Sequence, residues 1–221
     1  MPQQKSKKII IYFFLFLMIG TLNNKNFNSI HFIKINEITI IGLDEKNNLQ
    51  LMNDINYMKL NNLFYLNKSK LIEIINANSL VENFSVFRKY PSTLNIKIDK
   101  TNFLASLKKN GESFILGSNG KLIKLGIMDI DVPFIFGDLE IKNFFEFKKA
   151  IDESDLNYNE IKKLFFFKSG RWDIETKNDI LIKLPKDGVK EALNFFINFT
   201  IKNKKINMID LRQKNQIVTN E

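Results

Sequence analysis

The sequence of 221 residues contains no cysteine, one histidine, four prolines and three arginines. Without cysteine the protein can form no disulfide, no thiolate metal site and no cysteine nucleophile. The single histidine, His31, excludes a multi-histidine metal centre and argues against a Ser-His-Asp triad. We therefore expect no metal, no cofactor and no catalytic residue, and a binding or structural protein rather than an enzyme.

Arginine is scarce although the chain is basic. The formal net charge is +9, and all but three of the 33 cationic side chains are lysines. Surfaces that bind phosphate usually rely on the bidentate arginine fork, and Arg88, Arg171 and Arg212 are far apart in the sequence. The charge therefore does not indicate nucleic-acid binding. With 44% hydrophobic and 26% charged residues, the chain has a globular composition that suits one ordinary domain or two small ones.

The longest apolar run lies near the N-terminus. Three lysines within residues 1–8 precede the uncharged run from Ile9 to Leu22. A basic segment before an apolar one predicts that the N-terminus stays in the cytoplasm and that the rest is exported. Fourteen residues of helix span only about 21 Å, against about 30 Å of bilayer hydrocarbon, so a cleaved signal peptide is the alternative. No small-x-small cleavage site is present near Gly20. We therefore expect an uncleaved single-pass anchor over residues 9–24.

Residues after the anchor predict a small α+β module. A β-branched segment ending in glycine indicates a strand, and apolar residues at helical spacing indicate two helices, the second capped by Asn67. Leu94, Ile96 and Ile98 alternate with polar residues, as in a half-buried strand. The expected order is strand Ile35–Gly42, helix Asn48–Leu60, helix Asn67–Ala77, strand Val81–Tyr90 and strand Thr93–Asp99.

The remaining sequence predicts a strand-rich module with flanking helices. Asn110-Gly111 between alternating apolar residues is a strong hairpin signal. We expect a linker over residues 131–137, because Pro133 and Gly137 interrupt regular secondary structure there. Helices are expected at Ile141–Ile151 and Val189–Lys202, and strands at Phe103–Leu107, Phe114–Leu116, Lys121–Leu125, Leu164–Phe167, Arg171–Thr176, Ile180–Leu184, Ile206–Leu211 and Gln216–Thr219.

Several short segments, taken in order, resemble one known family. They are RKYPSTLNI from Arg88, NGKLI from Asn119, VPFIFG from Val132, RWDI from Arg171 and IDLR from Ile209. Their order and spacing over nearly the whole chain resemble the FtsQ/DivIB family of cell division proteins. The residues that carry this likeness are Arg88, Pro91, Leu94, Gly120, Pro133, Gly137, Arg171, Trp172 and Asp210.

The resemblance implies a domain organisation and a location. Residues 1–8 would form a cytoplasmic tail, residues 33–100 a POTRA domain, residues 101–219 the family's β-domain and residues 220–221 a tail. The protein would lie in the inner membrane with its bulk in the periplasm, at the division septum. The family often carries Glu-x-x-Pro-x-Ala between the two domains. Here the matching stretch is KTNFLA, which retains only Ala105 and leaves the hinge undetermined.

The resemblance also implies a function. Proteins of this family are non-enzymatic scaffolds that join FtsB and FtsL and help to control septal peptidoglycan synthesis. A strand of FtsB would add to the edge of the β-domain, where backbone hydrogen bonds give affinity and alternate side chains give specificity. The POTRA domain would bind other septal proteins. The residues expected at the partner edge are Arg212, Gln213, Lys214, Asn215, Gln216, Ile217 and Val218.

The three arginines support this interpretation. All of them fall in segments that resemble the family, although lysine is the usual cation of this chain. Lysine cannot replace a planar bidentate contact, so we expect each arginine to make one.

Two other functions remain open at this point. The first is a POTRA-containing factor for envelope assembly or transport. The second is an anchored cell-wall enzyme, with carboxylates drawn from Asp129, Asp131, Asp138 and Glu140. Acidic residues beside proline and glycine are usually solvated loop residues, and no histidine, cysteine or Ser-x-x-Lys constellation accompanies these four.

Overall fold

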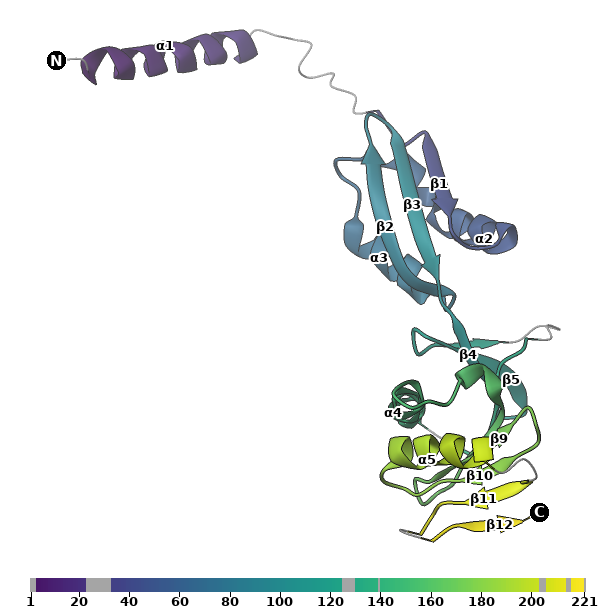
Figure 1. Ribbon diagram of the computed structural model, residues 1–221. Coiled ribbons are helices and arrows are strands. Elements are labelled where there is room, and N and C mark those ends of the chain that lie inside the picture. The colour runs from purple at the N-terminus through teal and green to yellow at the C-terminus, as the bar shows by residue number, and fades with distance from the viewer. Residues whose placement is uncertain are drawn as a thin grey trace.

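The computed structural model describes residues 3–22, 33–124, 130–138, 140–202, 206–213 and 216–220. Two sheets follow an N-terminal helix, one with three strands and one with nine (Figure 1). Each sheet has its own hydrophobic core, the first between Ile35 and Ile98 and the second between Ala105 and Leu211. The predicted α+β class is confirmed.

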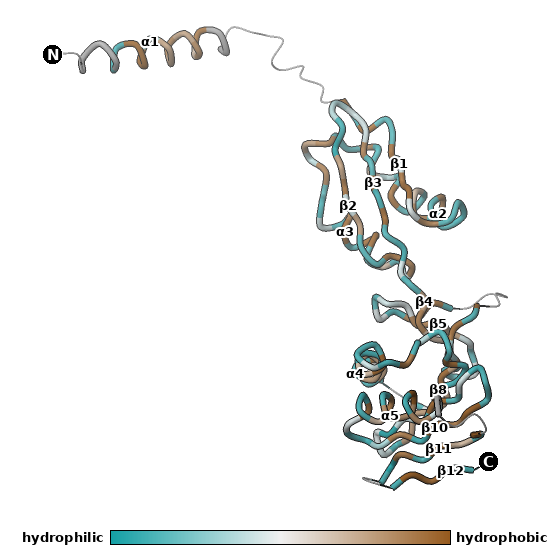
Figure 2. The backbone as a smooth tube through the Cα atoms, viewed as in Figure 1, coloured by the Kyte–Doolittle hydropathy of each residue, from teal (hydrophilic) through white to brown (hydrophobic). Residues whose placement is uncertain are grey.

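The apolar N-terminal segment forms helix α1 (Gln3–Leu22), and the middle of this helix is hydrophobic in Figure 2. Its side chains from Ile9 to Ile19 are exposed. Among the helices that the structure describes, none is both long and apolar enough to cross a bilayer. The helix was therefore predicted correctly, and its role as a transmembrane anchor is not confirmed. The reason lies in the sequence: lysines occupy its first turns and leave an uncharged run of 14 residues.

The first sheet belongs to a β-α-α-β-β unit, as predicted. Its order is β1-β3-β2, with β1 parallel and β2 antiparallel to β3. Helices α2 and α3 lie on one face of this sheet (Figure 1). The elements are β1 (Glu37–Ile41), α2 (Glu45–Ile55), a 3-10 turn η2 (Asn56–Leu60), α3 (Lys68–Ala77), β2 (Val81–Lys89) and β3 (Thr93–Lys100).

Local sequence signals set the limits of these helices. The Asp44 side chain accepts a hydrogen bond from the backbone N–H of Asn47, and Asn67 accepts one from Lys70 at 3.1 Å. Both caps satisfy an N–H group that the first helical turn leaves without a partner. Leu66 and Leu71 are both buried, as expected for a hydrophobic staple around the Asn67 cap.

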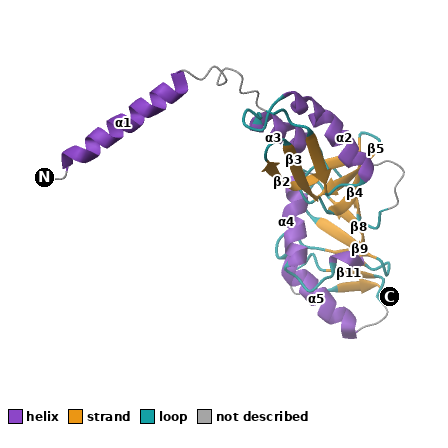
Figure 3. Cartoon of the chain, turned by 90° about the horizontal axis from the view of Figure 1, so that it is seen from above, coloured by secondary structure: helices purple, strands orange, loops and turns teal. Residues whose placement is uncertain are grey.

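The second sheet contains the rest of the described chain, in the order β12-β11-β10-β9-β8-β7-β4-β5-β6. Helices α4 and α5 contact each other and lie beside the sheet (Figures 1 and 3). The elements are β4 (Phe103–Lys109), β5 (Glu112–Gly117), β6 (Leu122–Lys124), β7 (Phe134–Phe136), α4 (Ile141–Asp152), η3 (Tyr158–Glu160), β8 (Ile161–Phe166), β9 (Trp172–Thr176), β10 (Leu181–Lys183), α5 (Val189–Lys202), β11 (Met208–Asp210) and β12 (Val218–Asn220).

The prediction of a linker over residues 131–137 is wrong in its centre. Phe134–Phe136 forms β7, which lies between β4 and β8, runs parallel to both and buries Ile135. Local signals could not reveal a three-residue strand between Pro133 and Gly137, because its partners are distant in sequence. The Pro133 carbonyl accepts a hydrogen bond from the N–H of Ser106 at 2.9 Å, which extends the pairing.

Gly137 ends β7 at a position that only glycine can occupy. Its φ is +110°, a conformation that side chains rarely adopt. A Cβ atom there would overlap the carbonyl oxygen of Phe166, on the neighbouring strand β8. The glycine of the VPFIFG segment therefore allows two backbones to approach closely.

Trp172 anchors the second core. Its ring stacks on Phe147 of α4, with centroids 4.5 Å apart and planes inclined by 7°. It also contacts Phe166 at 4.8 Å, which ties helix α4 to strands β8 and β9. Trp172, Ile174 and Thr176 alternate along β9 and are all buried. Asp173, on the opposite face of the strand, is also buried.

A polar network joins the two domains where the family motif was missing. The buried Thr101 hydroxyl donates to Glu82 at 2.9 Å and lies 3.1 Å from the Ser118 hydroxyl. Ser118 donates to the same carboxylate at 2.7 Å. Asn119 donates from its amide to two backbone carbonyls of the first domain, each at 2.9 Å. The turn between β5 and β6 therefore supplies most of the contacts at this junction.

Candidate partner-binding edge

Strand β12 forms one edge of the nine-stranded sheet. It pairs on one side with β11, in the register Met208↔Asn220, Ile209↔Thr219 and Asp210↔Val218. No other described strand lies against it. All three of its residues are exposed. The strand lies one or two residues later than predicted and includes Asn220, which was expected to belong to a tail.

The loop before β12 is held by an arginine–carboxylate pair. The Arg212 Nε atom donates to both carboxylate oxygens of Asp210, at 2.8 and 2.9 Å, and its Nη2 donates to Oδ2. The backbone N–H of Arg212 adds a fourth bond, at 3.1 Å to Oδ1. These bonds hold the pKa of the Asp210 carboxyl below its usual range. Arg212 therefore makes the planar contact that was expected for it.

Asp173 brings a second arginine to the same part of the sheet. In register, Lys183 of β10 stands between Asp173 of β9 and Asp210 of β11. Arg171 donates to Asp173 through Nε at 3.3 Å and lies 4.4 Å above the Phe167 ring. Burial raises the pKa of Asp173, and the charges of Arg171 and, more weakly, Arg212 oppose this rise. Arg171 and Arg212 thus converge on carboxylates of nearby strands.

A groove of about 700 Å³ lies beside the edge, between the start of α5 and the loop before β12. Its apolar lining includes Phe195 and Ile217, which are 41% and 43% exposed. Glu191 and Arg212 supply charges at its margin. The other lining residues are Pro185, Lys186, Asp187, Gly188, Ala192, Leu211, Gln213 and Gln216.

The structure brings together most of the predicted partner residues. Arg212, Gln213 and Gln216 line both this groove and a smaller pocket of about 400 Å³. Val218 begins β12 and borders the smaller pocket, and Ile217 lies in the groove. Lys214 and Asn215 lie outside the described residues. The contribution of α5 was missed, because only the tertiary fold places its first turns next to a loop that follows β11.

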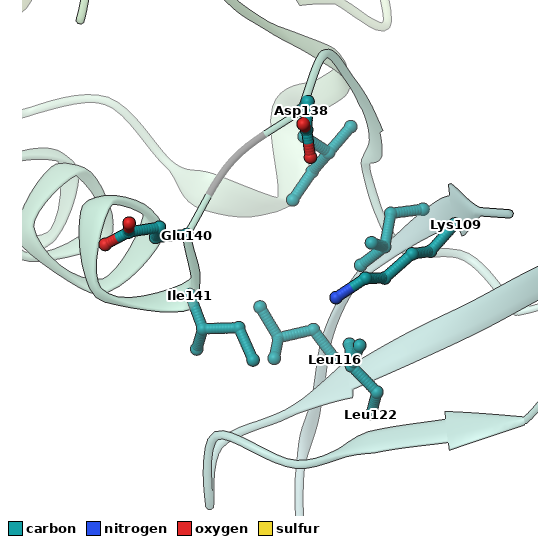
Figure 4. A pocket seen from close by; sticks show the side chains of 8 residues that line it. Lys109, Leu116, Leu122, Asp138, Glu140 and Ile141 are labelled. Carbon is teal, nitrogen blue, oxygen red and sulfur yellow. The ribbon is translucent and has the colours of Figure 1, made fainter.

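The three described carboxylates of the enzyme alternative are not gathered at a single site. Asp131 binds Lys177 through both oxygens, at 2.7 and 2.8 Å. Asp138 and Glu140 border a different pocket of about 520 Å³ with an apolar lining, and Glu140 points away from Lys109 (Figure 4). Asp129 lies outside the described residues. Within the described part of the chain, no three acidic or histidine side chains are grouped as a metal site.

Comparison with known families assigns both domains. A family model described as "POTRA domain, FtsQ-type" matches residues 33–100, and one described as "Cell division protein FtsQ/DivIB, C-terminal" matches residues 105–212. The chain belongs to the FtsQ/DivIB family. Its members are non-enzymatic divisome scaffolds, in agreement with the predicted absence of catalysis.

Individual relatives carry the same names. The chain is 25% identical to "Cell division protein FtsQ" of Rickettsia bellii over 190 residues, which are 83% of this chain and 70% of that protein. It is 29% identical to "Cell division protein DivIB" of Clostridium botulinum over 128 residues, 55% of this chain and 46% of that one. Among solved structures it is similar to the extracytoplasmic domain of DivIB from Geobacillus stearothermophilus, with 11% identity, a TM-score of 0.35, and coverage of 48% of this chain and 96% of that one.

The family-like residues have structural roles that differ from one another. Leu94 is fully buried in the POTRA core, and Pro91 follows a cis peptide bond in the turn between β2 and β3. Gly120 turns the chain at φ +74° in the FtsQ-type β-domain. Arg88 lies on β2 opposite Leu94 and makes no ion pair with any described residue. The expectation that all three arginines make planar bidentate contacts therefore holds for Arg212, in part for Arg171, and not for Arg88.

Proposed function

We propose that this FtsQ/DivIB protein is a bitopic divisome scaffold that binds an extended segment of an FtsB- or FtsL-type partner along β12. The observation that carries this proposal is the open side of β12 beside an apolar groove. A strand added to this edge would gain backbone hydrogen bonds, and its flanking side chains would reach the groove beside Ile217.

Charges beside the edge suggest which side chains the partner presents there. Arg212 is fixed by Asp210 and borders both the groove and the smaller pocket. A guanidinium held in place loses little side-chain entropy when a partner carboxylate approaches it. We expect the partner segment to place apolar side chains in the groove and an acidic side chain near Arg212.

Co-expression with FtsB- and FtsL-type proteins tests the proposal. The wild-type chain should be recovered in a complex. Val218→Pro removes a backbone donor of the edge strand and Ile217→Lys places a charge in the groove, so each should abolish recovery. Ile72→Lys is the matched control, because Ile72 is 44% exposed on α3, away from the edge. A complex that survives truncation after Leu211 would contradict the edge-strand proposal.

The proposal includes an anchor in the inner membrane with the domains in the periplasm. It is supported by the exposed apolar side chains of α1 and by the lysines that precede them. Snorkelling lysines and interfacial asparagines can lengthen a short apolar helix enough to span. The full chain should resist extraction from membranes at alkaline pH, whereas residues 33–221 should be soluble. Extraction of the full chain from membranes at alkaline pH would contradict the proposed membrane anchor.

The domain boundaries, septal location and control of septal peptidoglycan synthesis belong to the same proposal. The POTRA domain would bind other septal proteins, as the family assignment of residues 33–100 suggests. Depletion should produce filamentous cells that fail to divide. Normal division after depletion would contradict this role even if a complex with FtsB- and FtsL-type proteins forms.

A further inference from the structure

Three segments meet at one end of the POTRA domain. The backbone N–H of Ile35 donates to the carbonyl of Asn61 at 3.0 Å, and that of Asn36 donates to Ser92 at 2.9 Å. The Phe64 and Tyr90 rings lie 5.1 Å apart. Residues 33–37, 59–68 and 88–93 are called the POTRA tip below. This end lies opposite the junction with β4, so the tip and the β12 edge are at opposite ends of the two-domain unit (Figure 1).

The tip exposes large apolar side chains. Ile33, Leu60, Phe64, Tyr65 and Tyr90 are each between 53% and 72% exposed. Single exposed apolar residues are common, but five on three adjoining segments form a patch, and such patches mark protein or membrane contacts. Two of the five are tyrosines, whose rings combine an apolar body with a polar end.

The same surface is basic. Its cationic residues are Lys34, Lys59, Lys68, Arg88 and Lys89, whereas Glu37 is its single carboxylate. None of the five cations forms an ion pair with another described residue. The patch therefore combines aromatic and aliphatic groups with positive charge that is not neutralised within the domain.

We propose that the POTRA tip docks on the surface of a membrane that contains anionic lipids. Aromatic side chains favour the level of the headgroups, where lysines can lay their stems along apolar surface and keep the ammonium groups near phosphates. Four of the five cations are lysines, which suit diffuse headgroup charge and lack the rigid fork for one fixed partner.

The position of the tip in the chain favours lipid over a partner protein. Ten residues, 23–32, separate α1 from the first described residue of the tip. Even fully extended, ten residues reach only about 36 Å. If α1 lies in the membrane, the tip is the part of the ectodomain held nearest to the bilayer. Docking would fix the orientation of the POTRA domain and hold β12 away from the lipid surface, where a partner can reach it.

This inference concerns a surface remote from β12 and does not depend on strand addition. It can be tested without α1, because every residue of the two hydrophobic cores lies between Ile35 and Leu211. Residues 33–221 would be sedimented with vesicles of phosphatidylglycerol and phosphatidylethanolamine, and with vesicles of phosphatidylcholine alone. Binding is expected to the anionic vesicles and should weaken as salt is raised.

Two double variants separate the apolar and the electrostatic contributions. Lys68→Gln with Lys89→Gln should weaken binding about 25-fold, at about fivefold for each cation removed. Phe64→Ser with Tyr65→Ser should weaken it about tenfold or more. The matched controls are Lys46→Gln with Lys97→Gln in the same domain, and Phe136→Ser in the β-domain, and these should bind as wild type. Circular dichroism checks that each variant is folded.

The outcomes are distinct. Loss of vesicle binding in both tip variants, with binding retained in the controls, supports the proposal. It is overturned if residues 33–221 do not bind anionic vesicles, or if tip and control variants bind equally. It is also overturned if the tip variants keep vesicle binding and lose a septal protein partner, since the tip would then be a protein interface. None of these results bears on complex formation at β12, so the two proposals can fail separately.

Discussion

The Lys121 ammonium nitrogen lies 2.6 Å from the carbonyl oxygen of Asn76, 45 residues earlier in the chain and in the other domain. Asn76 lies in the last turn of α3, where carbonyl groups have no helical partner and carry partial negative charge. Lys121 also donates to the Asn78 carbonyl at 3.3 Å. A lysine of the β-domain thus caps a helix of the POTRA domain, which couples the orientations of the two domains.

Removing this cap should loosen the junction between the domains. Lys121→Met with Asn119→Ala eliminates four hydrogen bonds to POTRA carbonyls, each contributing about 0.5–1.5 kcal/mol. We expect greater relative motion of the domains, seen as a larger radius of gyration in small-angle scattering of residues 33–221. Lys124→Met is the control, because Lys124 pairs with Glu112 inside the β-domain. An unchanged radius in the double variant would show that other contacts hold the junction.

Gly137→Ala should destabilise the β-domain strongly. The added Cβ atom would overlap the Phe166 carbonyl, at a φ that alanine also disfavours. Strain and overlap together should cost about 3 kcal/mol or more, measured by urea unfolding followed by circular dichroism. Gly111→Ala is the control, since Gly111 also has positive φ but has open space around it, and it should cost about 1–2 kcal/mol. Equal losses would rule out the close backbone approach as the cause.

Trp172→Ala should also lower the free energy of unfolding of the β-domain. The ring contacts Phe147 and Phe166 in the core, so its loss leaves a cavity and should cost about 3–5 kcal/mol. Phe195→Ala, at a residue 41% exposed on α5, should cost much less in the same unfolding measurement. A loss at Trp172 no larger than that at Phe195 would contradict the anchoring role of the tryptophan.

Arg212→Lys should free the loop before β12. Lysine keeps the charge but cannot reproduce the bonds that Arg212 makes through Nε and Nη2 to the Asp210 carboxylate. Faster amide exchange is expected at Ile209 and Thr219, together with weaker partner binding. Arg88→Lys should leave the amide exchange and the partner binding unchanged, because Arg88 has no ion pair among the described residues. Identical amide exchange in the two variants would show that the loop before β12 does not depend on the bidentate guanidinium contact.

Acid should remove the contribution of Asp210 to stability. Its folded pKa lies below the ordinary value of 3.8 because of its bonds to Arg212. The unfolded state therefore binds the proton more readily, and the stabilisation is complete above pH 3.8 and is lost as the pH falls below it. Asp210→Asn should flatten the dependence of melting temperature on pH in this range. If the melting temperature of Asp210→Asn falls with acid as steeply as that of the wild type, Asp210 is not the source of this dependence.

Local elements were predictable wherever short-range physics decides them. Asn67 caps α3 at the expected residue, and Leu94, Ile96 and Ile98 are buried as their alternation predicted. The Asn110-Gly111 turn has positive φ at both residues, as the hairpin signal requires. Caps, alternation and turns depend on neighbours a few residues away, so the sequence carries them directly.

Elements that depend on distant partners were not predictable. β7 is three residues long and exists because β4 and β8 pair with it on both sides. The groove beside β12 requires α5 and the loop after β11 to meet, and the POTRA tip requires three segments to converge. No local sequence pattern predicts these contacts between distant segments.

The absence of cysteine and the single histidine were enough to exclude disulfides, thiolate and multi-histidine metal sites and a cysteine nucleophile, because these need side chains that the chain lacks. The same composition singles out three arginines among 33 cationic side chains. Only the tertiary structure distinguished their roles, since the contacts that a guanidinium makes depend on which carboxylate or ring the fold places beside it. Arg212 has Asp210, Arg171 has Asp173 and Phe167, and Arg88 has no ion-pair partner within the described residues.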